Sequence, residues 1–327
     1  MTLRGPLGWA PQGVFEDRSM SFLSTMVTEI KRKPKFHFGL KARYSVWGYL
    51  FLIPAVVILL IFRIIPMIEA AYYSFTSYDL FSPPRFVGFK NYIDLLGDPV
   101  FLQSVRVSAL YVIGSVIPVW IISLALAKLI LSVTRFRGLF RGVIFMPVIM
   151  SMVVVAVLWR FLYFFPSGMV NTFLGFVGIK PLPWLTTPNM ALLSIILIAI
   201  WRASPYFMVI FTAGLQAIPE TYYEAGKIDG TNAWTEFWYI TLPLLKPTIL
   251  LVVVMSVIVA LKVFAVPQIM TNGGPAGGTN VVPLQIYKTG FEFFKMGKAS
   301  AMSMFLFLVM MVFSIFQIRL FSSDGEM

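Results

Sequence analysis

The sequence has 327 residues, of which 58% are hydrophobic and only 12% are charged, and its mean hydropathy is +0.84. Soluble domains carry about 25% charged residues, so this composition predicts an integral membrane protein. The 26 Lys and Arg residues exceed the 14 Asp and Glu residues. We interpret the excess as basic cytoplasmic loops and not as nucleic-acid binding, because no aromatic-basic nucleic-acid motif accompanies it. The lack of cysteine excludes disulfides, thiolate metal sites and cysteine nucleophiles.

The first 45 residues are basic and do not have the form of a secretory signal peptide. No apolar core precedes a small-residue cleavage site, so we expect the first apolar segment to stay attached as an anchor. The single histidine, His37, lies near Lys35 in this region, where a solvated side chain is expected and not a metal ligand. The sequence therefore predicts a basic cytoplasmic tail over residues 1–45.

Six apolar stretches are long enough to cross a bilayer, which takes roughly 20 residues each. They cover residues 46–66, 107–131, 143–165, 190–214, 248–270 and 299–320. The predicted fold class is thus all-α, a polytopic membrane protein with six transmembrane helices in a permease domain of residues 46–322. An even number of spans places both termini on the same side, with residues 323–327 as a short cytoplasmic tail.

Basic residues in the connections predict the orientation of these spans. Two connections assigned to the cytoplasm are basic: one has Lys128, Arg135, Arg137 and Arg141, and the other has Lys227 and Lys246. The last external connection opposes this assignment, because it contains Lys288, Lys295 and Lys298. The orientation therefore depends on the five earlier elements.

The connection over residues 215–247 contains more local structure than a simple loop needs. Pro219 suits the first turn of a helix and Gly230 suits its end, after which Thr231 or Asn232 can cap a second short helix. One interpretation is a pair of interfacial helices anchored by Tyr222, Tyr223, Trp234 and Trp238. The small residues Ala225 and Gly226 directly after Glu224 favour a docking surface instead, because they let another surface approach the backbone.

The same residues resemble a known motif. Glu224-Ala225-Gly226, then Gly230 after three residues and Ile240-x-Leu242-Pro243 after nine more, is similar to the EAA loop of ABC importer permeases. Gly226 stands where the family has a second alanine, a change that weakens a helix by about 1 kcal/mol but preserves close approach. Three further segments resemble carbohydrate-uptake permeases of the maltose and glycerol-3-phosphate type: Gly214-Leu-Gln-Ala-Ile-Pro219, Thr271-Asn-Gly-Gly-Pro275 and Gly297-Lys-Ala-Ser-Ala301.

This resemblance implies the transmembrane fold of a type I ABC importer in a bacterial or archaeal cytoplasmic (inner) membrane. It implies a second homologous permease subunit, two cytoplasmic ABC ATPase subunits that bind ATP and Mg, and an extracellular or periplasmic solute-binding protein that delivers a sugar. Glu224 would pair with a basic residue of the ATPase, Ala225 and Gly226 would fit a cleft on it, and Asp229 and Gly230 would form the corner of the coupling loop.

The absence of certain catalytic motifs from the sequence agrees with ATP hydrolysis by a separate subunit. No G-x-x-x-x-G-K-[ST], H-E-x-x-H or G-x-S-x-G segment occurs. We therefore expect no catalytic residue, metal site or cofactor in this chain, and no enzyme activity by the chain alone.

Two charged side chains lie deep within predicted spans, where charge is costly. Arg202 is near the middle of the fourth span and Lys262 slightly past the middle of the fifth. They either face a hydrated substrate pathway or are structural, with Arg202 satisfying backbone groups near Pro205. The candidate pathway also includes Trp159, Trp201, Tyr206 and Gln268, whose rings and amide suit a sugar. Arg160 is interpreted as extending to the membrane interface.

The solute class has alternatives. Lys262 together with Arg202 suits an acidic sugar, whereas the EAA loop is shared with permeases for other solutes such as polyamines or phosphate esters. A secondary transporter is a further alternative, but it needs an ion-coupling site and usually an internal repeat. Only Glu69 is acidic near a span, at its outer edge.

Overall fold

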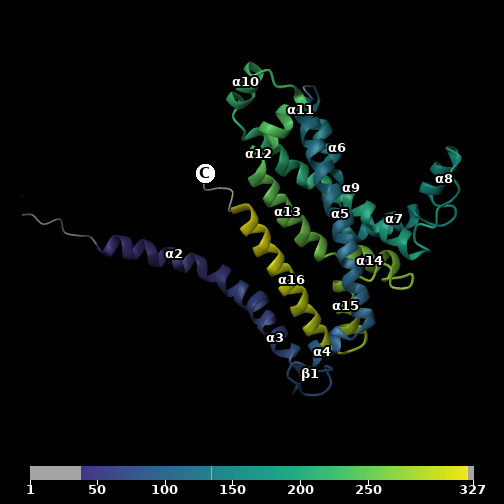
Figure 1. Cartoon of the computed structure of the whole chain (residues 1–327). Helices are drawn as coiled ribbons and strands as arrows, with labels where there is room; N and C mark the ends of the chain where they lie inside the picture. The colour runs from purple at the N-terminus through teal and green to yellow at the C-terminus, as the bar shows by residue number, and fades with distance from the viewer. Residues whose placement is uncertain (1–37, 134, 323–327) are drawn as a thin grey trace, which may run out of the picture. The chain divides into compact units, whose positions relative to one another are not determined.

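The computed structural model describes residues 38–133 and 135–322 (Figure 1). Most of the predicted basic tail, and the predicted tail of residues 323–327, lie outside the described residues. The chain divides into two units, Met1–Pro66 and Met67–Met327. The first contains α2 (Phe38–Leu59), the π-helical turn η1 (Leu60–Ile64) and the start of α3 (Ile65–Ser74). The predicted boundary at residue 45 falls within α2.

The second unit carries the candidate functional sites. Its first elements are β1 (Thr76–Ser77), β2 (Arg85–Phe86), α4 (Lys90–Leu96), α5 (Pro99–Ser132), α6 (Arg137–Ile149), α7 (Met152–Leu162), α8 (Met169–Phe176) and α9 (Pro188–Gln216). After α9 come α10 (Glu220–Ile228), α11 (Ala233–Glu236), η2 (Phe237–Thr241), α12 (Leu242–Leu244) and α13 (Lys246–Leu261). The last are α14 (Ala265–Thr271), α15 (Val282–Tyr287), η3 (Lys288–Glu292) and α16 (Met296–Ser322).

The predicted all-α fold of a polytopic membrane protein is confirmed, with one short antiparallel pair, β1 and β2, as the exception. Among the described residues, five helical segments are long and apolar enough to cross a membrane: Tyr49–Ser74, Pro99–Ser132, Pro188–Gln216, Lys246–Thr271 and Met296–Arg319. The stretch predicted as a span over 143–165 is instead two helices, α6 and α7, bent by 94°. Pro147 lies in the last turn of α6, and Met150 and Ser151 adopt extended backbone before α7. Hydropathy cannot reveal this bend, because both halves are apolar.

Helix α5 packs against α9 and α13 through small and polar residues. Gly114 on α5 faces Ile196 on α9, where a Cβ atom would lie 2.8 Å from the Ile196 Cδ1 atom. Gly214 on α9 approaches Thr248 on α13 so closely that a Cβ atom would collide with its side chain. Because lipid removes the hydrophobic advantage of helix association, membrane helices rely on such close approach.

Two hydrogen bonds join the same three helices. The Trp120 Nε1–H group of α5 donates to the Ser256 Oγ atom of α13 over 2.8 Å. The Ser123 hydroxyl of α5 donates to the Ser204 carbonyl oxygen of α9 over 3.0 Å, directly before Pro205. Polar side chains that bond between helices are typical of membrane bundles. They hold α5, α9 and α13 in one register.

Asn171 organises the connection between α7 and α9. Its Oδ1 atom accepts hydrogen bonds from the Leu182 backbone N–H and from the Trp184 Nε1–H group, at 3.0 and 2.9 Å. The Trp184 ring stacks on Tyr163, with centroids 5.0 Å apart. Asn171 is buried, so its bonds replace those that water would make.

The start of α5 and the start of α16 are tied by charge. Asp98 caps α5, where its Oδ1 atom accepts from the Val100 and Phe101 N–H groups at 2.9 and 3.3 Å. Its Oδ2 atom lies 2.6 Å from the Lys298 Nζ atom of α16. Partial burial raises the pKa of the Asp98 carboxyl, but the bonds from Lys298 and from the backbone outweigh burial, so the pKa lies below the ordinary value of 3.8.

We expect Asp98→Asn to lower the stability of the detergent-solubilised protein by up to about 1 kcal/mol at neutral pH, because asparagine keeps the cap but loses the ion pair. A carboxyl with a lowered folded pKa stabilises the fold above its unfolded pKa, and this contribution is lost as the pH falls through the folded pKa. The difference from the unmodified protein should therefore shrink below about pH 4. Thermal unfolding at several pH values measures it. Asp94→Asn, on the exposed face of α4, is the control and should show no such difference.

Candidate functional site

The helical segment between α9 and α13 is the first candidate site, and its helices α10 and α11 lie at the upper end of Figure 1. Pro219 precedes α10 in extended conformation, and the helix ends at Asp229. Gly230 follows with φ of +77°, a conformation that glycine adopts without strain. The Thr231 N–H group then bonds to the Gly226 carbonyl oxygen at 2.9 Å, which closes the C-terminus of α10.

A reciprocal cap starts the second part of this segment. The Asn232 Oδ1 atom accepts from the Trp234 and Thr235 N–H groups at 3.0 and 2.9 Å, and the Thr235 Oγ1 atom accepts from the Asn232 N–H group at 2.9 Å. Of the two cap residues that the sequence allowed, the structure uses Asn232. The Tyr223 hydroxyl lies 3.3 Å from the Thr241 Oγ1 atom and joins α10 to η2. The segment is thus a folded unit with two helical arms.

Glu224 and Ala225 lie exposed on α10, and Asp229 and Gly230 are exposed at its end. Within the described part of the chain, the Glu224 carboxylate has no ion-pair or hydrogen-bond partner. Gly226 is buried. A Cβ atom there would lie 2.6 Å from the Ile240 Cδ1 atom. The close approach that the sequence predicts at Gly226 is therefore made by a residue of the same chain, and it lets α10 lie against η2.

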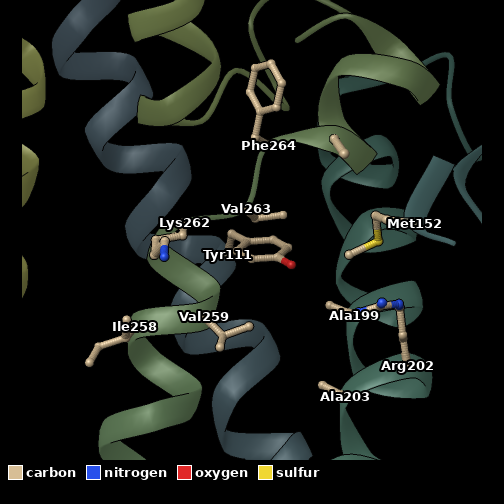
Figure 2. A pocket seen from close by; sticks show the side chains of 11 residues that line it. Tyr111, Met152, Ala199, Arg202, Ala203, Ile258, Val259, Lys262, Val263 and Phe264 are labelled. Carbon is tan, nitrogen blue, oxygen red and sulfur yellow. The ribbon is translucent and has the colours of Figure 1, made fainter. Parts of the chain in front are cut away.

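The second candidate site is a cavity of about 450 Å³ between α5, α9 and α13 (Figure 2). Its walls are mostly apolar. They consist of Tyr111, Met152, Ala199, Arg202, Ala203, Ile258, Val259, Lys262, Val263, Phe264 and Ala265. A mostly apolar cavity with a few polar groups has the form of a small-molecule site, which typically measures about 300–1,000 Å³.

A break in a membrane helix lines this cavity. The sequence predicts one span over 248–270, whereas α13 ends at Leu261 and α14 begins at Ala265. Lys262, Val263 and Phe264 occupy the break, and all three line the cavity. Irregular backbone at membrane depth is tolerated where it is buried in protein or lines a water-filled space. The break is therefore the feature expected where a polar solute passes.

Arg202 and Lys262 are the charged residues in the cavity wall, and no acidic residue of the described ranges lines it. Figure 2 shows Arg202 on α9 and Lys262 at the end of α13 on opposite sides of the Tyr111 ring. The Arg202 Nε atom is buried, and it has no hydrogen-bond partner among the described residues. No hydrogen bond from Arg202 to the backbone near Pro205 is found in that part of the chain. The cavity wall thus contains two cationic side chains, which suit an anion or a hydroxyl group.

The remaining candidate pathway residues lie outside the cavity wall. Trp159 and Trp201 meet edge to face with centroids 5.5 Å apart, and the Trp159 Nε1 atom is buried without a partner in the described structure. Tyr206 is 40% exposed on α9. Gln268 lies half-buried on α14.

Arg160, for which extension to the membrane interface stays a prediction, makes a contact that the sequence did not predict. Its side chain is exposed, and its Nη1–H group donates to the Ile269 carbonyl oxygen of α14 over 3.3 Å. This bond ties the bent α7 to the short helix after the break.

Sequence reasoning missed Tyr111, Met152 and Phe264 as cavity residues. Tyr111 is the only one with a sequence signal, since it places a hydroxyl within an apolar span. Met152 and Phe264 reach the cavity because α7 bends and because α13 breaks. Pro147 accompanies the bend, but a proline alone does not predict an angle of 94°.

Comparison with known proteins identifies the family. Residues 107–322 match the family described as "Binding-protein-dependent transport system inner membrane component". The chain is 32% identical over 284 residues to the trehalose/maltose transport system permease protein MalF of Thermococcus litoralis, covering 86% of this chain and 95% of that protein. It is 34% identical over 286 residues to the lactose transport system permease protein LacF of Rhizobium radiobacter, covering 85% of this chain and 95% of that one.

A solved structure shares the fold. A chain of a bacterial ABC transporter involved in the import of the acidic polysaccharide alginate superposes with a TM-score of 0.77 at 23% identity, covering 86% of this chain and 97% of that chain. The family match spans well over half of the sequence and includes both candidate sites. The chain therefore belongs to the family of binding-protein-dependent transport system inner membrane components: it is a multi-pass inner membrane protein, the transport permease of an ABC system and not itself an enzyme.

Proposed function

We propose that this permease carries a sugar or oligosaccharide into the cytoplasm as part of an ATP-driven importer. The observation that carries the proposal is the similarity over more than four-fifths of the chain to permeases named for trehalose, maltose and lactose. The cavity between α5, α9 and α13 supports it, because the cavity is large enough for a sugar and lies where a spanning helix is interrupted.

Two ABC ATPase subunits with bound ATP and Mg drive the proposed transport, and α10 is the coupling helix that docks on one of them. The exposed Glu224 carboxylate, which has no partner among the described residues, supports this role, because it is available for a basic residue of a partner. A second permease subunit completes the membrane assembly, and a soluble binding protein delivers the sugar from outside.

The end of the bundle that carries α10 to α12 faces the cytoplasm in this proposal, with both chain termini on that side. Arg135, Arg137 and Arg141 support it, since they flank the start of α6 and basic residues collect in cytoplasmic loops. α15 and the start of α16 then face outward (Figure 1). This orientation places Lys288, Lys295 and Lys298 toward the incoming solute.

An acidic sugar is the more specific candidate. Arg202 and Lys262 line the central cavity and no carboxylate compensates them there. For the same reason a polyamine, which is a cation, fits this cavity poorly, whereas a phosphate ester remains an alternative. Family membership disfavours a secondary transporter.

ATP should energise uptake directly. Vesicles reconstituted with the assembled transporter and its binding protein should accumulate radiolabelled sugar when supplied with ATP, and should continue when ionophores collapse the ion gradients. Uptake that stops with the gradients would contradict the proposal and favour secondary transport.

Glu224→Arg should leave the protein in the membrane and abolish substrate-stimulated ATPase activity, because a reversed charge on α10 repels the basic partner. ATP hydrolysis by the reconstituted complex measures it. Asp94→Arg makes the same charge reversal on α4 at the opposite end, and should retain activity. Full activity in Glu224→Arg would exclude this carboxylate from coupling.

Lys262→Gln should reduce uptake of an acidic sugar by about tenfold and leave uptake of a neutral analogue nearly unchanged, since a desolvated ion contact is lost. Initial uptake rates of both sugars test this. Arg106→Gln removes another cation from α5, outside the cavity, and should affect neither sugar. An equal loss for both sugars in Lys262→Gln would refute the charge-selective role.

A further inference from the structure

A second cavity, of about 370 Å³, lies at the end of the bundle opposite to α10. In contrast to the central cavity, most of its lining residues are polar or charged. It is lined by Asp98, Val100, Asn280, Gln285, Lys288, Thr289, Phe293, Lys295 and Lys298. These residues come from the start of α5, the loop before α15, α15 itself, the π-helical turn η3, the residues between η3 and α16, and the start of α16. None of them belongs to the wall of the central cavity. None belongs to the proposed coupling segment either, which is the connection of residues 215–247 that contains α10 to α12.

The charge of this outer cavity is positive. Of its three lysines, Lys298 is paired with Asp98 over 2.6 Å. The Lys288 Nζ group donates to the Asn272 carbonyl oxygen at 2.7 Å, a neutral partner that leaves its charge uncompensated. Lys295 is exposed, and its side chain has no bonding partner within the described ranges. Two ammonium groups in the described structure therefore carry a charge that no carboxylate compensates, and they can attract an anion.

A buried polar network forms the inner wall. The Asn280 Nδ2 group donates to the Gln285 Oε1 atom at 2.7 Å, and the Gln285 Nε2 group donates to the Thr289 Oγ1 atom at 3.2 Å. Asn280 is only 7% exposed, yet its Oδ1 atom has no hydrogen-bond partner in the described chain. A buried acceptor without a donor is costly, so this position favours a ligand that brings a hydroxyl group.

We infer that the outer cavity binds an acidic sugar before it enters the central cavity. The charge-uncompensated ammonium groups of Lys288 and Lys295 match a carboxylate, and the Asn280 Oδ1 atom matches a sugar hydroxyl. The exposed Phe293 ring offers an apolar face for the C–H side of a sugar ring. A cavity of this volume holds a sugar unit, whereas an inorganic anion fills a small part of it. The inference rests on the proposed function and names its substrate class.

Binding of trigalacturonate and of neutral galactotriose to the assembled transporter in lipid nanodiscs tests the site by calorimetry. The unmodified transporter should bind the acidic trimer more tightly. Lys288→Gln with Lys295→Gln should weaken this binding about tenfold, and Lys295→Gln alone about threefold. Lys295→Gln alone is included because Lys288→Gln also removes the hydrogen bond to the Asn272 carbonyl oxygen and could disturb the fold. The Lys295 variant leaves that bond in place. Lys180→Gln, an exposed lysine outside the cavity, should bind as the unmodified protein does.

Equal affinity for the two trimers, or unchanged affinity for trigalacturonate in the lysine variants, would overturn the inference. ATP-driven uptake of both trimers by the same preparations separates this outcome from failure of the proposed function. Uptake without charge discrimination rejects the outer site and leaves sugar import standing. Selective, lysine-dependent binding without uptake of either sugar supports the site and counts against the proposed function.

Discussion

The close packing of α5 against α9 and α13 is the constraint on which the rest of the membrane unit depends. Hydrocarbon gives these helices no hydrophobic reason to associate, so they rely on close approach and hydrogen bonds. Gly114 admits Ile196, and the bonds from Trp120 to Ser256 and from Ser123 to Ser204 set the register. The central cavity lies between these same helices, so the packing that holds the bundle together also positions Arg202 and Lys262.

The same helices connect the cavity to the coupling segment. α9 carries Arg202 and leads into α10, while α13 follows α12 and ends at the break that carries Lys262. Gly214 and Thr248 hold α9 against α13 close to the segment. In the proposed assembly, a displacement of α10 by a docked ATPase would therefore move two walls of the cavity together. Inside the segment, Gly226 lets α10 pack closely on η2 at Ile240.

The outer and the central cavity share a physical pattern. Each is basic, and each lies where the backbone leaves regular helix: at the break after α13, and at the π-helical turn η3 with the loop before α15. Charged and irregular groups are costly in a membrane protein unless water or a ligand meets them. Sequence reasoning found Arg202 and Lys262 because charge inside an apolar span is visible in one dimension. From the sequence alone, Lys288, Lys295 and Lys298 counted against the predicted orientation of the spans. The sequence does not show that these three lysines line one cavity together with Asn280.

The sequence by itself determined the membrane class, the approximate spans and the presence of a helical segment over residues 215–247, for which we propose the coupling role. Hydropathy and the spacing from Glu224 to Pro243 are local properties, and they hold whatever surrounds them. Only the tertiary structure decided where helices bend or break, that Gly226 faces Ile240, and that Tyr111, Met152 and Phe264 share a cavity with Arg202 and Lys262. These facts depend on distances between segments far apart in the chain. Such distances follow from packing, which composition and periodicity do not specify.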